Sequence, residues 1–260
     1  MKYLLNWINQ SKLNLSLLSK NKSAIFFLSQ NPHLINWNSL SQNTNAYEIL
    51  KNNINKINWT LLSSNENSNC LKLLINKPYL IDWKNISGNP NAIEIIKNNK
   101  NKINWDYLSI NPHPEAIELL RNNIDKINWN NISLNQSYLA MNIIKDNLNK
   151  INWYFLSSNK FAIELLIENK DKINWQRFNL NETNDAIMLL IRENKIDWDL
   201  ISYNPSAFKL LILNKNEINY KNLSYNYNQN LLYLLKENHV LIDWNGFSQN
   251  PWIFKEKNEF

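Results

Sequence analysis

A large apolar residue recurs along the chain every 22 to 24 residues, and similar polar and apolar positions surround it each time. An aliphatic residue precedes it by two positions, and an apolar residue follows it by three. We call this the anchor position. Leu15 holds it first, Tyr220 and Trp244 hold it last, and tryptophan holds it between them, at Trp37, Trp59, Trp83, Trp105, Trp129, Trp153, Trp175 and Trp198. A constant period of this length indicates a repeat protein.

Each unit carries the start signals of two helices, as residues 81–102 (IDWKNISGNPNAIEIIKNNKNK) show. Asp82, or Asn in most units, is an N-cap candidate directly before the anchor, which predicts a first helix of about two turns. The Asn89-Pro90 step predicts the start of a second helix, with Asn as the cap and Pro in the first turn. The second helix then shows a one-sided apolar pattern, Ala-Ile-x-Ile-Ile.

The 24-residue units carry two extra residues between the cap Asn and the second helix, as in residues 111–116, and equivalent insertions fall in 65–70, 135–140, 181–186 and 226–231. Stacked repeats tolerate insertions that are confined to one loop. An asparagine also recurs near the end of the second helix, and we expect it to cap that end in the left-handed conformation. These residues are Asn53, Asn99, Asn123, Asn147, Asn169, Asn214 and Asn238.

These patterns predict an all-α solenoid of about ten two-helix repeats in a single domain, residues 1–260. Residues 1–14 are expected to form a degenerate N-terminal cap, 15–250 the repeats, and 251–260 a polar C-terminal tail. The outermost apolar faces would then lack neighbours, and the array would open first from its ends. The alternative is a solenoid like that of leucine-rich repeats, which have a similar period but need alternating leucines on a strand.

The phrase Ile-Asn-Trp-x-x-Leu-Ser-x-Asn-Pro-x-Ala-Ile-Glu-Leu-Leu resembles the Asn- and Trp-rich short repeats of large DNA viruses of the mimivirus-like group. The resemblance covers about residues 15–250. It implies a helical repeat fold and a viral origin, and it brings no catalytic residue, cofactor or partner. The unit around residues 226–230, which lacks the Pro and Ala of the phrase, departs most from it.

Composition narrows the possible functions. The chain has two glycines, Gly88 and Gly246, which argues against Gly-rich phosphate loops. One cysteine, Cys70, suits a reducing compartment. With no secretory signal and no long apolar run, we expect an intracellular protein (in the host cytoplasm if viral), not secreted and without a membrane partner. The net charge of +6 is spread over many lysines, and we interpret it mainly as a solvated surface in an A/T-rich coding background.

No residue cluster indicates catalysis, a cofactor or a metal. His33, His113 and His239 lie in different units without metal-ligand spacing. Cys70 holds the small Ala position of a second helix, which predicts a buried thiol. The glutamates Glu48, Glu94, Glu118 and Glu164 recur at one position, and the first three precede Lys51, Lys97 and Arg121 by three residues, as in surface ion pairs. We therefore expect no enzyme.

The tryptophans have two interpretations. They form the apolar core between stacked units, or they form a ladder on which single-stranded nucleic acid stacks between lysines. Their fixed register with the flanking aliphatic positions favours the core, because an exposed row of large aromatics promotes aggregation.

The residues one, two and five positions after the anchor vary from unit to unit, and helix geometry places them opposite the packing positions. We call these positions the stripe. Aromatic and aliphatic residues at variable, exposed positions are typical of protein-binding surfaces. The candidate binding residues are Tyr107, Ile110, Tyr154, Phe155, Arg177, Tyr203 and Tyr225.

The sequence thus predicts a non-enzymatic scaffold that binds a protein partner through the stripe. The alternatives are a nucleic-acid-binding solenoid that uses its basic surface, and a self-associating structural component such as a virion protein. The identity of the partner and the choice between monomer and self-association stay open.

Overall fold

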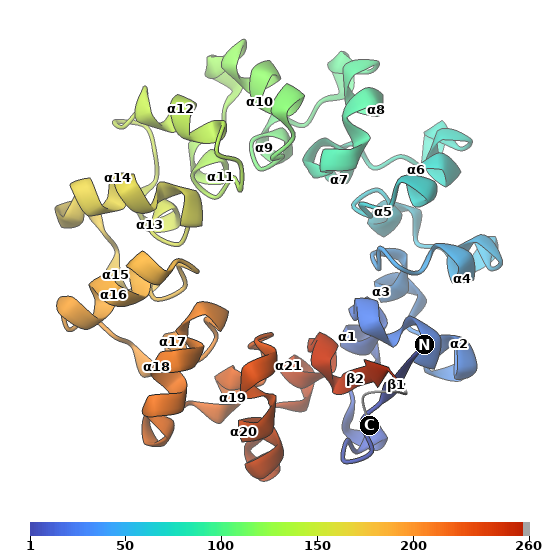
Figure 1. Ribbon diagram of the computed structural model, residues 1–260. Helices are drawn as coiled ribbons and strands as arrows, with labels where there is room; N and C mark the ends of the chain where they lie inside the picture. Colours follow the sequence, from blue (N-terminus) through green and yellow to red (C-terminus); the bar gives the residue numbers. More distant parts are fainter. Residues whose placement is uncertain (257–260) are drawn as a thin grey trace. The chain divides into compact units, whose positions relative to one another are not determined.

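The computed structural model describes residues 1–256, and short helices dominate it (Figure 1). A first helix begins at each anchor position. These helices are α1 (Leu15–Lys20), α3 (Trp37–Ser41), α5 (Trp59–Leu62), α7 (Trp83–Gly88), α9 (Trp105–Leu108), α11 (Trp129–Ser133), α13 (Trp153–Leu156), α15 (Trp175–Phe178), α17 (Trp198–Ile201), α19 (Tyr220–Leu223) and α21 (Trp244–Gln249). The helical-repeat prediction is confirmed.

A second helix follows each first helix up to α19. These helices are α2 (Ile25–Gln30), α4 (Tyr47–Lys51), α6 (Ser68–Ile75), α8 (Ile93–Lys97), α10 (Pro114–Arg121), α12 (Ala140–Lys145), α14 (Ile163–Glu168), α16 (Asn184–Arg192), α18 (Phe208–Leu213) and α20 (Leu232–Glu237). The strands of the described part, β1 (Lys2–Leu4) and β2 (Phe254–Glu256), lie near the chain ends and not in the repeats. The alternative of a leucine-rich-repeat-like solenoid is therefore wrong.

Short 3₁₀ turns complete the repeats, and the sequence pattern did not reveal them. One set precedes second helices: η2 (Lys22–Ala24), η6 (Pro90–Ala92), η9 (Lys160–Ala162), η11 (Pro205–Ala207), η13 (Gln229–Leu231) and, after α21, η15 (Pro251–Ile253). The other set precedes first helices: η1 (Gln10–Lys12), η3 (Pro32–Leu34), η4 (Ile54–Lys56), η5 (Pro78–Leu80), η7 (Lys100–Lys102), η8 (Ile124–Lys126), η10 (Lys170–Lys172), η12 (Lys215–Glu217) and η14 (His239–Leu241).

The chain divides into two compact units, which are described separately. The terminal unit comprises Met1–Asn67 together with the chain from Trp198 onward, and the central unit comprises Ser68–Asp197. In the central unit the first helices α7 to α15 follow one another along one side, and the second helices α6 to α16 follow one another along the other (Figure 1). Its core lies between these two rows, where Ile96, Leu108, Leu120 and Ile132 are buried.

The predicted caps at the start of the first helices are confirmed. The Asn58 side chain accepts a hydrogen bond from the Leu61 backbone N–H at 3.0 Å, and Asp82 serves α7 in the same way through the Asn85 N–H. Asn89 also caps as predicted, but it caps the 3₁₀ turn η6 rather than the α-helix, by accepting from the Asn91 N–H. These bonds satisfy backbone donors that a helix start leaves without a partner.

The asparagines at the end of the second helices cap by a different mechanism from the one predicted. Asn53, Asn99 and Asn123 have φ between −136° and −142°, so they are not left-handed. Instead, each side-chain amide donates to the carbonyl oxygen four residues earlier, as Asn53 does to Ile49 at 2.8 Å. The same bond occurs at Asn99, Asn123, Asn147, Asn169, Asn214 and Asn238. The amide satisfies a terminal carbonyl group directly and makes a backbone of positive φ unnecessary.

Among the described non-glycine residues, Asn194 has a positive φ, of 52°. This residue ends α16, in the unit whose spacing is 23 residues. Here the Lys195 N–H donates to the Leu190 carbonyl oxygen at 2.9 Å. The left-handed residue thus closes the helix where the chain is too short for the usual turn.

A serine four positions after the anchor bridges successive repeats. Ser109 is buried, and its hydroxyl donates to the Trp105 carbonyl oxygen at 2.7 Å. The Ser109 hydroxyl oxygen also accepts a hydrogen bond from the backbone N–H of Asn128, the cap residue of the next repeat, at 3.0 Å. Asn179 replaces this serine in one unit and makes equivalent bonds, with its amide on Trp175 and its carbonyl oxygen on the Asp197 N–H. The position therefore requires one donor and one acceptor.

A buried asparagine six positions after the anchor forms a second bridge. The side-chain amide of Asn135 donates to the backbone carbonyl oxygens of Ser109 and Asn111, both in the preceding repeat, at 2.9 and 3.0 Å. Asn43, Asn65, Asn111, Asn159, Asn181 and Asn226 each donate to the two equivalent carbonyl groups. We call this series the asparagine ladder. It satisfies backbone acceptors that repeat stacking removes from water.

The anchor tryptophans are half-buried and lie at the edge of the core, so the predicted packing between stacked units leaves part of each ring exposed. The innermost side chains are the apolar residue three positions after the anchor, such as Leu62, and the serine beside it. Trp105 packs against the core at its edge. Lysines three positions before the next anchor lie over the indole rings at 4.5 to 5.1 Å from the ring centroid. These pairs are Lys56 with Trp37, Lys102 with Trp83, Lys126 with Trp105 and Lys150 with Trp129.

The two ends of the chain are bonded to each other, which contradicts the expectation that the terminal faces lack neighbours. In the terminal unit α1 packs against both α3 and α21 (Figure 1). The Asn21 amide donates to the carbonyl oxygens of Ser248 and Asn250 at 3.1 and 3.0 Å. The Asn14 N–H donates to the Ser248 hydroxyl at 2.8 Å. These are the bonds that successive repeats make elsewhere, so the first repeat takes the place of a successor to the last.

The segments outside the repeats strengthen this junction. Strands β1 and β2 pair antiparallel with Leu4 opposite Phe254, and the Leu5 N–H donates to Ile253. Ile253 and Phe254 are buried, so the first part of the tail expected to be polar belongs to the core. The rest of that predicted tail, residues 257–260, lies outside the described residues.

Candidate interaction surface

The stripe residues lie on the first helices or within two residues of their ends, and they differ in exposure. Ile110, Tyr154 and Tyr225 are 37%, 47% and 39% exposed. The other four candidates, Tyr107, Phe155, Arg177 and Tyr203, are half-buried. Several of these side chains contact a stripe residue of an adjacent repeat.

Three of the central unit's candidates form one cluster. The Tyr154 and Phe155 rings meet edge to face, with centroids 5.3 Å apart. The Arg177 guanidinium of the next repeat lies over the Tyr154 ring at 5.5 Å. The Nε atom of Arg177 is buried without a hydrogen-bond partner, and the residue as a whole is half-buried. The result is a cationic group held on an aromatic platform.

Tyr107 and Ile110 lie on and just after α9, one repeat away from Gly88. The Lys84 ammonium of the preceding repeat lies over the Tyr107 ring at 5.0 Å. The same ring passes Gly88, where an added Cβ would lie 3.5 Å from its Cδ1 atom, an ordinary contact. The sequence pattern did not indicate this lysine neighbour of Tyr107.

In the terminal unit the structure brings Tyr203 and Tyr225 together, with ring centroids 5.6 Å apart. The Tyr225 ring then lies against the backbone of Gly246, where any Cβ would overlap it. Burial, followed by the nearby Asp243 and Tyr203, raises the pKa of the Tyr225 phenol above its ordinary value. Tyr225 is therefore a neutral phenol with one ring face on the protein.

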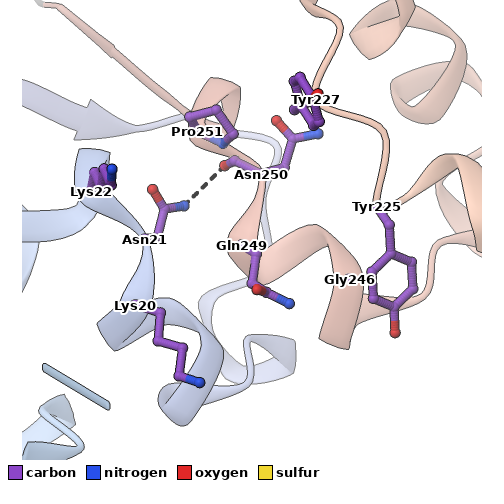
Figure 2. A pocket seen from close by; sticks show the side chains of 9 residues that line it. All are labelled: Lys20, Asn21, Lys22, Tyr225, Tyr227, Gly246, Gln249, Asn250 and Pro251. Atoms are coloured by element: carbon purple, nitrogen blue, oxygen red, sulfur yellow. Dashed lines mark hydrogen bonds between the residues drawn. The ribbon is translucent and has the colours of Figure 1, made fainter. Parts of the chain in front are cut away.

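A pocket of about 540 Å³ opens beside Tyr225, where the last repeats meet the first one (Figure 2). Its lining residues are Lys20, Asn21, Lys22, Tyr225, Tyr227, Gly246, Gln249, Asn250 and Pro251. The dashed line in Figure 2 marks the ladder bond from the Asn21 amide to the Asn250 carbonyl oxygen. The stripe prediction included Tyr225 but not the two lysines, because nothing in the sequence indicated that the first repeat follows the last.

The second helices and the 3₁₀ turns that follow them also expose apolar side chains. Leu213, Val240, Tyr79 and Met188 are 68% to 82% exposed. They are scattered over different repeats, and none of them shows the repeat-to-repeat ring contacts of the stripe. Some of the polar positions pair as predicted, since Lys97 binds Glu94 and Arg121 binds Glu118. Lys51 instead lies over the Tyr47 ring.

The residues with reactive side chains lie apart from the stripe. Cys70 is buried in α6, as predicted, and burial raises the pKa of its thiol to about 11. His113 caps α10 by accepting from the Glu115 N–H at 3.2 Å. Across residues 1–256, no three His, Cys, Asp or Glu side chains gather into a group that could hold a metal ion.

No helix in the described part of the chain combines the length and apolar character needed to cross a membrane. We find no family model, curated protein or solved structure that matches the chain. The resemblance to viral repeats therefore remains an expectation from the sequence alone, and the function has to be argued from the surface.

Proposed function

We propose that the protein is a non-enzymatic repeat scaffold that binds a protein segment through the stripe. The observation that carries this proposal is the contact between successive repeats along the stripe, as between Tyr154 and Arg177 or between Tyr203 and Tyr225. Side chains that are already ordered before binding lose little conformational entropy when a partner docks. Tyr and Arg are also the residues most enriched among those that dominate binding energies.

The exposed apolar residues of the second helices and of the 3₁₀ turns that follow them support binding less well. Leu213 and Val240 extend into solvent with more than four-fifths of their surface exposed. A partner would have to immobilise such side chains, at a cost of about 0.5–1.5 kcal/mol for each rotamer-rich one. Single exposed apolar residues are also common on proteins without any binding role.

The lysine positions weigh against the nucleic-acid alternative. Stacking of bases needs accessible aromatic faces, yet Lys56 and Lys102 lie over the rings of Trp37 and Trp83. These lysines therefore take a ring face that a base would use. Binding of nucleic acid through phosphate contacts alone would decrease steeply with salt, which a titration against salt concentration measures.

The proposal can be tested by selecting a phage-displayed library of random peptides on the wild-type protein. The selected peptides are then measured against Ile110→Ser with Tyr154→Ser, which alters the exposed part of the central unit's stripe. The matched control is Ile75→Ser with Tyr79→Ser, which removes the same residue types from exposed positions at the second-helix side of the same unit.

We expect the stripe variant to lose binding of the selected peptides and the control to retain it, with helical circular dichroism unchanged in both. If the stripe variant binds the peptides as tightly as the control, or if no peptide is enriched on the wild type, the stripe is not the binding surface.

A further inference from the structure

The pocket at the junction of the chain ends is built from equivalent positions of three successive repeats. Tyr225 and Tyr227 stand five and seven positions after the anchor Tyr220, and Lys20 and Lys22 stand at the same positions after Leu15. Gln249 and Pro251 hold these positions in the repeat between them. Two phenol side chains therefore form one wall, two ammonium side chains form the other, and the middle repeat lies between the walls (Figure 2).

Gly246 makes this arrangement possible. It stands two positions after the anchor Trp244, where other repeats carry larger residues such as Tyr107, Phe155 or Arg177. Because Gly246 has no side chain, the Tyr225 ring lies against its backbone, and a Cβ at this position would overlap the Tyr225 ring. Gly88, the other glycine, leaves ordinary contact distances to the nearest ring.

The charged residues that line the pocket are all basic. Lys20 and Lys22 are exposed, and no acidic residue is among the nine that line the pocket. The nearby Asp243 carboxylate already accepts hydrogen bonds from the N–H groups of Asn245 and Gly246. The Asn21 and Asn250 amides are used by the asparagine ladder. The pocket thus presents to a ligand the two ammonium groups, the Gln249 side chain and the aromatic wall.

We propose that this pocket binds an extended peptide segment in which acidic and aromatic side chains alternate. In an extended chain successive side chains point to opposite sides. One set would then face Lys20 and Lys22, and the other would stack on Tyr225 and Tyr227. This inference rests on the proposed function, since it names the partner chemistry for one part of the same surface, and it adds a site that includes three repeats.

Binding at this pocket also acts on the chain ends, because the pocket takes residues from both of them. Lys20, Asn21 and Lys22 come from the first repeat, and the other lining residues come from the last two. The complete site exists only while the ladder bond between Asn21 and Asn250 holds the repeats together. A ligand that binds the joined form and not the separated form stabilises the junction.

The test measures the fluorescence anisotropy of a labelled peptide of alternating Glu and Tyr residues with the full-length protein at low ionic strength. The first variant is Lys20→Gln with Lys22→Gln. Its matched control is Lys100→Gln with Lys145→Gln, which removes the same charge from exposed positions in the central unit. The second variant, Gly246→Ala, displaces the Tyr225 ring, and its control is Gly88→Ala. A peptide with Gln in place of Glu serves as the uncharged probe.

We expect the Lys20/Lys22 variant and Gly246→Ala to weaken binding of the Glu–Tyr peptide by about tenfold or more, while both controls stay close to wild type. The uncharged peptide is expected to bind more weakly than the charged one. The proposal is overturned if the wild type does not bind the Glu–Tyr peptide, if the two lysine variants lose affinity equally, or if Gly246→Ala binds as tightly as Gly88→Ala. Since Ile110 and Tyr154 lie in the other unit, the stripe experiment can succeed while this one fails.

Discussion

The Asn111 side-chain amide donates to the backbone carbonyl oxygens of Ser87 and Asn89 at 2.9 and 3.1 Å. Both acceptors belong to the preceding repeat, and the Asn111 side chain is fully buried. A backbone carbonyl group that loses water without gaining a donor costs free energy. Repeat stacking in this protein therefore depends on a repeated polar bond as well as on apolar contact.

Replacing Asn111 by Asp should destabilise the protein strongly. The carboxylate has nearly the same shape, but it has no hydrogen to donate and would face the carbonyl oxygens of Ser87 and Asn89. Losing two buried hydrogen bonds and adding a buried charge should lower the free energy of unfolding by about 3–5 kcal/mol. Urea unfolding followed by circular dichroism measures this. Asn101→Asp, at an exposed position of η7, should change stability by less than about 0.5 kcal/mol.

Removal of a bridging hydroxyl should have a smaller effect. In Ser109→Ala the Asn128 backbone N–H loses its acceptor, while the small Ala side chain fits the space. We expect a loss of about 1–3 kcal/mol, the cost of leaving a buried donor without a partner. Hydrogen exchange should show faster exchange at the Asn128 amide in particular. Protection at Asn128 equal to that of the wild type would mean that this serine does not hold the next repeat.

The lysines that lie over tryptophans should contribute modestly to stability. Lys56 is placed 4.5 Å from the centroid of the Trp37 ring. Lys56→Gln should lower the free energy of unfolding by about 0.5–1 kcal/mol, whereas Lys56→Arg should preserve most of it because arginine also binds aromatic faces. Lys100→Gln is the matched control at an exposed position. Equal stabilities of Lys56→Gln and Lys100→Gln would show that the ring contact adds nothing.

The sequence predicts those features that depend on neighbours in the chain. The caps Asn58 and Asp82, the register of the helices and the buried position of Cys70 follow from local spacing and agree with the structure. The asparagine ladder was missed because a sequence gives the positions of Asn111 and Ser87 but not the partner of each amide. The left-handed prediction for Asn53 failed because its side chain satisfies the Ile49 carbonyl group directly.

At the candidate site, too, the sequence indicated the positions of side chains along the chain but not their contacts with other repeats. The structure places Tyr107 and Tyr154 on first helices and Tyr225 just after one, but their neighbours come from the next or preceding repeat. Lys20 and Lys22 could not be assigned to the pocket from the sequence, since more than 200 residues separate them from Gln249. Contacts between residues so far apart in the chain depend on tertiary packing, which the pattern within one repeat does not specify.

The buried thiol should make stability depend on alkaline pH. Burial raises the pKa of Cys70 from 9.0 to about 11 in the folded protein. The unfolded chain therefore releases this proton at lower pH than the folded chain does, and the thiol's contribution to stability is present below pH 9 and decreases as pH rises to about 11. Cys70→Ala is the control, because most repeats carry Ala there.

Between pH 9 and about 11, the free energy of unfolding of the wild type should fall by at most about 2–3 kcal/mol relative to that of Cys70→Ala. In addition, iodoacetamide should label Cys70 in the native protein only at the rate of transient opening. Rapid labelling of the native protein at pH 8 would contradict a buried thiol.

The junction between the chain ends can be tested by comparing the stability effects of Asn21→Asp and Asn111→Asp. Asn21 makes the same two bonds to Ser248 and Asn250 that Asn111 makes to the repeat before it. If the ends are joined as the structure shows, Asn21→Asp should cost nearly as much stability as Asn111→Asp, about 3–5 kcal/mol. If the ends instead open freely in solution, Asn21 is already hydrated and its replacement should cost less than about 1 kcal/mol. Hydrogen exchange of the amides that follow Asn14 and Asn21 gives an independent measurement. In the joined form these amides should be as protected as those after Asn111, and protection should be lost in Asn21→Asp together with the pairing of Leu4 with Phe254.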